Sequence, residues 1–215
     1  MPYAIRRSQR ARRVSVNVDP VSGEVEVVLP ARAAERVAAS AVKELGPWIA
    51  KQQEKALAAR QRVLDRRGTV PYLDGTLELV PETGRTRAHR KGDRLLVPGS
   101  DPAAAIERYY RRMAKMEVVP RLDAAVSELG TTYKSVRIAG QRTRWGSCTS
   151  AGVMSFNWRL LLAPERVLDY VIWHEACHLL VLNHSPRYWA LVERHVPDYR
   201  EASKWLRTNA ATLVL

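Results

Sequence analysis

The sequence has 215 residues, 46% of them hydrophobic, and a formal net charge of +13 at pH 7. Such a composition is typical of a globular protein with one large domain or two small ones. It argues against a membrane-spanning protein, because no apolar run reaches the ~20 residues that a spanning helix needs. Two cysteines are too few for a disulfide framework. The basic N-terminus lacks an apolar signal core, so we expect a cytoplasmic protein.

The N-terminal segment is predicted to form a hairpin and two helices. Apolar and polar residues alternate over residues 13–19 and again over 24–29, which is typical of two half-buried strands. Alanine-rich residues 31–45 favour a helix, and residues 48–67 continue as a second helix with a charged face. Gly46-Pro47 separates the two helices, because both residues disfavour a helix interior.

Two further strand pairs are predicted, over residues 69–80 and 85–97. Asp74-Gly75 is a tight-turn signal within the first pair. Asp101-Pro102 then opens a long helix, because aspartate caps a helix N-terminus and proline fits the first helical position. We expect this helix to continue to about residue 129, with an interruption or kink at Pro120.

The C-terminal half is predicted to contain a small antiparallel sheet and three more helices. Its strands are expected over residues 133–139, 142–148 and 153–158. Its helices are expected from Ala163-Pro164 to near Asn183, over residues 187–196, and from Pro197-Asp198 onward. With a boundary near residue 100, the chain is an α+β protein. A basic hairpin and helix region (1–100) then precedes a C-terminal domain (101–215).

The helix predicted from Ala163-Pro164 carries the motif His174-Glu175-Ala176-Cys177-His178. Two histidines four residues apart lie on one face of a helix, where neutral imidazoles can bind one metal ion. Glu175 lies about 100° further round the helix, so its carboxylate can reach a water on the metal without binding the metal. The motif therefore predicts two ligands and one general base. Two histidines paired by chance in a core helix are the alternative, but the buried glutamate beside them would then be costly.

His184 is the expected third ligand. Asn183 tolerates a left-handed backbone, so the helix can end there and the chain can bring His184 back to the metal. Glu193, on the following helix, is a rival for this position, and His195 is a weaker rival.

The positive charge gives a further expectation. Residues 1–100 hold 19 basic and 11 acidic side chains, a net charge of +8. Such an excess suits a polyanion, above all nucleic acid bound through its phosphates. A merely solvated arginine-rich surface is the alternative. The N-terminal arginines expected to bind nucleic acid are Arg6, Arg7, Arg10, Arg12 and Arg13.

An ordered series of short motifs surrounds the histidines. They are Arg144-Trp-Gly-Ser-Cys148, Phe156-Asn-Trp-Arg-Leu160, His174-Glu-Ala-Cys-His178, Asn183-His-Ser-Pro186 and Pro197-Asp-Tyr199. Together with the arginine-rich N-terminal hairpin, this series resembles the YgjP-like zinc metallopeptidase family, which is related to the SprT-like and WLM zincins. Tyr188, where phenylalanine is expected, is a mild departure.

The resemblance implies a zincin-like α+β fold, with zinc held by His174, His178 and His184 and with Glu175 as the general base. The expected substrate is a protein or peptide, cleaved by a zinc-activated water. An exposed edge strand, either 142–148 or 153–158, is expected to accept an extended peptide. The candidate substrate-binding residues are Arg144, Asn157 and Tyr188. A surface arginine and a turn-capping asparagine are the alternatives for the first two.

Two other functions suit the same residues. The first is metal-dependent hydrolysis of a non-peptide substrate such as a nucleotide phosphoanhydride, with the basic residues holding the phosphates. The second is a nucleic-acid-associated module with a structural metal. Structural zinc sites normally have four protein ligands, and the sequence offers three good ones.

Overall fold

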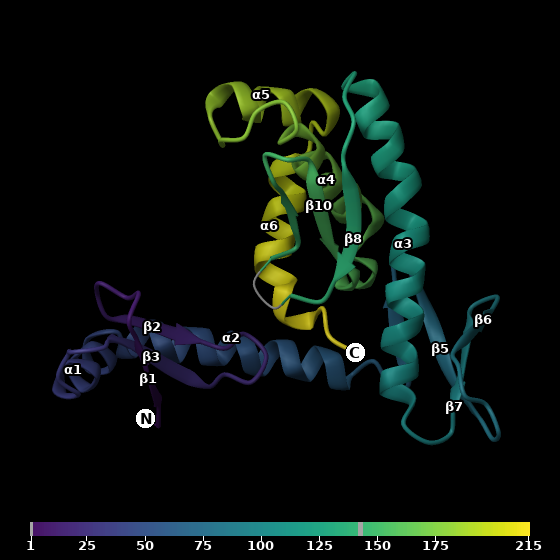
Figure 1. The fold of residues 1–215 in the computed structure, drawn as a ribbon. Helices are drawn as coiled ribbons and strands as arrows, with labels where there is room; N and C mark the ends of the chain where they lie inside the picture. The colour runs from purple at the N-terminus through teal and green to yellow at the C-terminus, as the bar shows by residue number, and fades with distance from the viewer. Residues whose placement is uncertain (1, 142–143) are drawn as a thin grey trace. The chain divides into compact units, whose positions relative to one another are not determined.

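The computed structural model describes residues 2–141 and 144–215. The chain forms two compact units (Figure 1). The smaller comprises residues 1–65 with 209–212, and the larger comprises residues 66–208 with 213–215. No helix among the described residues is both long enough and apolar enough to cross a membrane.

A three-stranded sheet and two helices form the smaller unit. Its elements are β1 (Ala4–Ser8), β2 (Ser15–Val18), β3 (Val25–Pro30), α1 (Arg36–Glu44), α2 (Gly46–Leu64) and the short 3-10 helix η2 (Ala210–Thr212). The strand order is β1-β3-β2, with β1 parallel and β2 antiparallel to β3. Val27 and Leu29 of β3 pack with Ala38 of α1 and Ile49 of α2, and all four are fully buried.

β2 and β3 pair where the alternating pattern predicts a hairpin. β1 was not predicted, because it pairs in parallel with β3, a strand distant in sequence. The first helix begins at Arg36 and not at residue 31. The Arg7 guanidinium donates hydrogen bonds to the carbonyls of Ala31 and Ala33 (3.0 and 2.9 Å), and these carbonyls are thereby held outside the helix.

Two sheets and four α-helices form the larger unit. The first sheet contains β4 (Thr69–Tyr72), β5 (Gly75–Glu82), β6 (His89–Lys91) and β7 (Arg94–Pro98), in the order β4-β5-β7-β6. The second contains β8 (Ser135–Ala139), β9 (Gly146–Cys148) and β10 (Val153–Asn157). The α-helices are α3 (Pro102–Glu128), α4 (Glu165–Cys177), α5 (Pro186–His195) and α6 (Tyr199–Asn209), and a short 3-10 helix, η1 (Trp158–Leu162), precedes α4.

The first sheet and the long helix differ in detail from expectation. The two-residue turn between β4 and β5 is Leu73-Asp74, one position before the predicted one, and Leu73 adopts a positive φ of 52°. Helix α3 continues through Pro120 as one element, without an interruption. Pro120 is exposed, so the hydrogen bond that its missing N–H removes faces solvent.

The second sheet has β10 at its centre, in the order β8-β10-β9. β10 runs parallel to β8 and antiparallel to β9, so the sheet is mixed and not antiparallel as predicted. Residues 153–157 are paired on both sides and cannot be an open edge, which corrects one of the two edge-strand expectations. The predicted strand 142–148 is present as β9, and its positions 142 and 143 lie outside the described residues.

The compact units divide between Asp65 and Arg66, not near residue 100. Val70, Leu77 and Leu95 of the first sheet share one hydrophobic core with α3 and α4, so this sheet belongs to the larger unit. The predicted division into a basic hairpin and helix region (1–100) and a metallopeptidase domain (101–215) stays a prediction.

Candidate active site

Helix α4 provides the first half of the site. It is a core helix, in which Val167, Leu168 and Val171 are almost completely buried. His174 and Glu175 lie in its last turn, and His178 is its C-cap residue. The helix therefore ends well before Asn183, and Asn183 is not among the described residues with a left-handed backbone. The chain turns instead at residues 178–181, where the His178 ring bonds the Val181 carbonyl through Nδ1 (3.0 Å).

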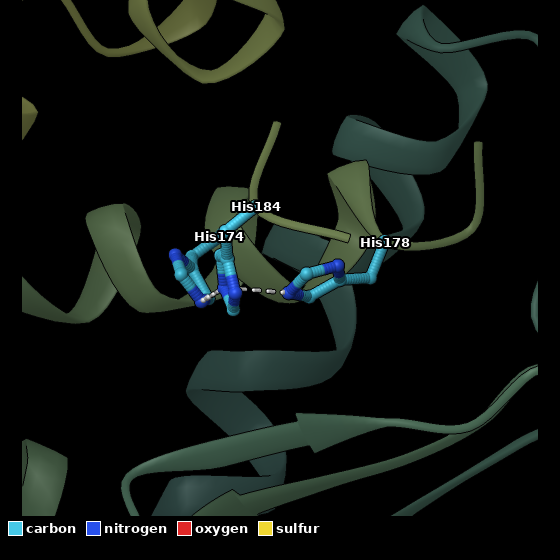
Figure 2. Close-up of side chains that lie close together, drawn as sticks. All are labelled: His174, His178 and His184. Carbon is cyan, nitrogen blue, oxygen red and sulfur yellow. Dashed lines mark hydrogen bonds between the residues drawn. The ribbon is translucent and has the colours of Figure 1, made fainter. Parts of the chain in front are cut away.

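Three imidazole rings converge beyond this turn (Figure 2). His184 Nε2 lies 3.2 Å from His178 Nε2 and 3.3 Å from His174 Nε2. All three ligand atoms lie within 4.8 Å of one another. Nitrogen ligands at the usual ~2.0–2.1 Å from a tetrahedral zinc ion are separated by about 3.3–3.4 Å. The two measured separations fit a shared metal ion of this kind.

The hydrogen bonding of His178 favours a cation among these nitrogens. Its Nδ1–H donates to Val181 O, so Nε2 of the neutral ring presents a lone pair toward His184 Nε2. His184 Nε2 can carry at most one proton. It could therefore donate a hydrogen bond to His178 or to His174 but not to both, although the two Nε2 atoms are almost equally close to it. One metal ion would satisfy all three lone pairs at once, whereas a single N–H donor cannot.

Burial keeps two of the rings neutral. It lowers the pKa of His174 to about 3, with nearby His178 and His184 adding to the effect. Burial also lowers the pKa of His178, partly opposed by its hydrogen bond to Val181. Neutral imidazole is the form that binds metal ions, so protons compete weakly at these two positions.

Aromatic side chains of α5 hold the rings in place. Tyr188 is completely buried, and its ring stacks on His178 with a centroid separation of 4.4 Å. The Tyr188 hydroxyl donates a hydrogen bond to the backbone carbonyl of His174 (2.8 Å). Trp189 stacks on His184 (5.5 Å) and on Tyr199 (5.2 Å). His174 Nδ1 is buried without a hydrogen-bond partner among the described residues, so this ring is positioned by packing and by the contact of its Nε2 with His184.

Glu175 is buried beside β9, with a relative exposure of 5%. A Cβ atom built on Gly146 would lie 2.5 Å from Glu175 Oε1 and 2.6 Å from its Cγ. Among the described residues, the carboxylate has no hydrogen bond or ion pair. Burial raises the pKa of Glu175 to about 7, and the charge of Arg144 opposes part of this increase. A buried carboxylate of this kind is costly unless it serves a function or lies near a cation.

Strand β9 leaves one edge of the second sheet open among the described residues. Its flanking hydrogen bonds to the central strand run from Asn157 N to Trp145 O (2.8 Å) and from Thr149 N to Val153 O (3.0 Å). Along an antiparallel strand, residues whose backbone N–H and C=O groups face the partner strand alternate with residues whose groups face away from it. The backbone N–H and C=O groups of Gly146 and Cys148 therefore face away from β10, on the strand that contacts Glu175.

Two of the three predicted substrate-binding residues have other partners. Both amide hydrogens of Asn157 are donated within the protein, to the carbonyls of Gln141 (2.7 Å) and Arg144 (3.1 Å), so none is left for a substrate. Its Oδ1 accepts from Arg159 N, which is the capping interpretation. The Tyr188 hydroxyl is likewise occupied by His174 O. Arg144 is exposed and close enough to Glu175 to influence its pKa.

The rival metal ligands lie outside the histidine cluster. Glu193 forms an ion pair with Arg200 (2.7 Å). His195 stacks on Trp173 with a centroid separation of 4.2 Å, and its Nδ1 contacts Glu128 (2.8 Å). Neither Glu193 nor His195 belongs to the cluster of His174, His178 and His184.

The N-terminal arginines fall into two groups. Arg6 forms an ion pair with Glu26 (2.9 Å), and Arg7 binds Glu35 (3.3 Å) in addition to two backbone carbonyls. Arg10, Arg12 and Arg13 lie exposed in the loop between β1 and β2. Their role in nucleic-acid binding stays a prediction.

Sequence reasoning assigned no role in the site to Gly146 or Trp189, although Gly146 lies in the motif Arg144-Trp-Gly-Ser-Cys148 and Trp189 follows Tyr188 in the same series that carries the family resemblance. A glycine within a predicted strand is a sign that another group approaches the backbone closely, so Gly146 carried a usable signal. The spacing of Trp189 did not indicate its contact with His184, since an aromatic residue at helical spacing is equally expected in a core.

Comparison with known proteins bears on the identity of this site. The sequence profile described as "YgjP-like, metallopeptidase domain" matches residues 12–209. Comparison with curated proteins gave no match, and comparison with solved structures gave none. The matched region includes the three histidines, Glu175 and most of both compact units. The chain therefore belongs to the YgjP-like metallopeptidase family.

Proposed function

We propose that the protein hydrolyses peptide bonds with a zinc ion held by His174, His178 and His184. The convergence of three Nε2 atoms, two pairs of them 3.2 and 3.3 Å apart, is the observation that carries this proposal. Three imidazoles suit zinc, and three protein ligands leave a fourth position for water, as in catalytic zinc sites. When bound, zinc would supply an acidified water and would polarise the scissile carbonyl.

Glu175 is the proposed general base. It follows His174 directly on α4, so its side chain points about 100° away from that ligand. Its carboxylate would accept a proton from the attacking water and deliver it to the leaving amine. Gly146 supports this role, because the absence of a side chain there allows the carboxylate to lie against β9.

The open edge of β9 is the proposed substrate-binding strand. The outward backbone groups of Gly146 and Cys148 can pair with an extended peptide, as in other cases of strand addition. Binding of this kind uses the backbone of the substrate, so it would impose little side-chain specificity. Arg144, exposed at the end of this strand, is the remaining candidate for a side-chain contact with the peptide.

The test is a metal analysis of the purified full chain, followed by side-by-side assays on casein and on nucleoside triphosphates. We expect about one zinc ion per chain, cleavage of casein, loss of cleavage with a chelator and recovery with added zinc. Hydrolysis of triphosphates but not of casein would contradict the peptidase proposal. Bound metal that resists chelation, with no hydrolysis of either substrate, would instead indicate a structural site.

A further inference from the structure

A hollow lies in the larger unit, between helix α3 and strand β8, with a volume of about 250 Å³. Its floor is formed by apolar side chains from both elements, namely Met116, Val119, Val136 and Ile138. Met116, one of the lining residues, is 65% exposed. The groove shares no residue with the histidine site.

The groove follows from the periodicity of its two walls. Residues 112, 115, 116 and 119 recur at helical spacing and form one stripe along α3. Val136 and Ile138 are two residues apart on β8, so both point to the same face of the sheet. The two stripes meet along an apolar line that neither element covers.

Basic residues line the hollow as well, namely Arg111, Arg112, Lys115 and Arg137. Arg137 lies between Val136 and Ile138 on β8, so its side chain points to the opposite face of the sheet. Arg111 forms an ion pair with Glu107 (2.7 Å), and Arg112 lies over the ring of Tyr109 (5.5 Å). Arg112 and Lys115 have no carboxylate partner among the described residues. The basic residues that line the hollow therefore carry more positive charge than the nearby carboxylates neutralise.

Arg121, on another face of the same helix, differs from the basic residues of the groove in the number of carboxylates around it. Arg121 is surrounded by the carboxylates of Glu117, Glu165 and Asp169. These three carboxylates pair on that face, where α3 meets α4, and among the described residues Glu107 is the only carboxylate paired with a cation of the groove. Arg112 and Lys115 remain available to a partner of opposite charge.

We propose that the groove binds an acidic segment of another protein that carries one bulky apolar side chain. The apolar side chain would cover Met116 and Val136, while flanking carboxylates would pair with Arg112 and Lys115. A nucleic acid fits less well, because single strands use aromatic side chains for stacking and no aromatic side chain lines the groove. A duplex backbone would leave the apolar floor unused.

The test is fluorescence polarisation of the full chain with the labelled peptide Glu-Asp-Glu-Leu-Glu-Asp-Glu, whose integrity is checked by mass spectrometry. We expect saturable binding that weakens about tenfold or more when Arg112→Glu and Lys115→Glu are combined. Replacing the central leucine of the peptide with serine, or making Met116→Ser, should each weaken binding by roughly tenfold. Because binding is read directly, the result does not depend on whether the chain hydrolyses peptides.

Matched controls lie on helix α2, where Lys55, Leu57 and Arg60 are exposed. Lys55→Glu with Arg60→Glu, and separately Leu57→Ser, should leave the affinity within about twofold of the original value. Equal weakening by both charge reversals would mean attraction by net charge alone and would overturn the proposal. The proposal would also fail if no saturable binding occurred at low salt. The proposal would fail as well if the serine peptide bound as tightly as the leucine peptide and a DNA duplex displaced both. The surface would then be a general polyanion site.

Discussion

Gly146 on strand β9 lies directly against the carboxylate of Glu175 on helix α4. A methyl group at residue 146 would be 2.5 Å from Oε1 and 2.8 Å from Cδ of this glutamate, closer than non-bonded atoms can approach. Gly146 does not have a positive φ, so its backbone conformation is open to other residues. The glycine is required by the close approach alone, and it places the proposed substrate strand and the proposed base in contact.

The first prediction is that Gly146→Ala impairs catalysis more than folding. The added methyl must push the Glu175 side chain aside, and a misplacement of about 1 Å at a reacting group can cost on the order of 10²-fold in rate. We expect kcat/KM for casein to fall by about that factor while zinc content stays unchanged. Gly99→Ala is the control, because its methyl would meet nothing closer than Glu82 O at 3.9 Å. Equal activity in both variants would contradict the proposed contact.

The second prediction separates metal binding from chemistry. Glu175→Gln preserves the shape of the side chain but removes the carboxylate that accepts the proton. We expect full zinc occupancy, a folded protein, and a decrease in kcat of roughly 10²–10⁴-fold. Zinc content by mass spectrometry and initial rates of casein cleavage provide the two readouts. Turnover at the original rate would exclude Glu175 as the general base.

The third prediction concerns the third metal ligand. His184→Ala removes the imidazole whose Nε2 lies closest to both other rings, whereas Glu193→Ala removes a carboxylate paired with Arg200. We expect His184→Ala to weaken zinc binding by more than the 10–100-fold typical of outer-shell changes, and Glu193→Ala to leave it unchanged. A competition titration with a chromogenic chelator measures both affinities. The reverse outcome would assign the third position to Glu193.

The fourth prediction tests how Tyr188 supports the ligands. Tyr188→Phe keeps the ring on His178 but leaves the carbonyl of His174 without its 2.8 Å hydrogen bond. We expect a loss of about 1 kcal/mol in the free energy of unfolding and a zinc affinity lowered by up to about tenfold. Tyr133→Phe is the control, because its hydroxyl contacts Asp123 at the surface and should not influence zinc. An unchanged zinc affinity in both variants would show that the hydroxyl has no positioning role.

Local patterns predicted the elements that depend on neighbouring residues. Ala163-Pro164 and the one-turn spacing of His174 and His178 placed α4, and the distance of ten residues from His174 allowed His184 to return to the cluster. The end of α4 was wrong, because it depends on a contact between the His178 ring and Val181 O that no sequence pattern encodes. The turn needs no left-handed Asn183.

Pairings between distant strands were outside the reach of these patterns. The parallel pairs of β1 with β3 and of β8 with β10 join segments that no turn connects, so the open edge at β9 could not be distinguished from β10. Asn157 illustrates the same limit. Its side-chain amide donates hydrogen bonds to the carbonyls of residues 141 and 144, and the sequence does not indicate that these residues lie beside it in the fold. From sequence alone, a polar residue next to an active-site motif suggests a substrate contact equally well.

The last prediction concerns the basic loop between β1 and β2. Arg6 and Arg7 are held by intramolecular bonds, whereas Arg10, Arg12 and Arg13 are exposed and form the part of the predicted set best placed to contact phosphates. We expect the intact chain to bind duplex DNA without sequence preference. Its affinity should fall steeply with salt, because each neutralised phosphate releases counterions.

Changing Arg10, Arg12 and Arg13 together to serine should weaken this binding and reduce the slope of log K against log salt by about 0.9 for each phosphate that the loop no longer neutralises. The charge-matched control changes Lys51, Lys55 and Arg60 of α2 to serine, which lowers the net charge equally at exposed positions elsewhere in the same unit. A titration at two salt concentrations compares the three proteins. If the control weakened binding as much as the loop variant, the loop would not be a binding site. Absence of binding at low salt would leave the arginines as a solvated surface.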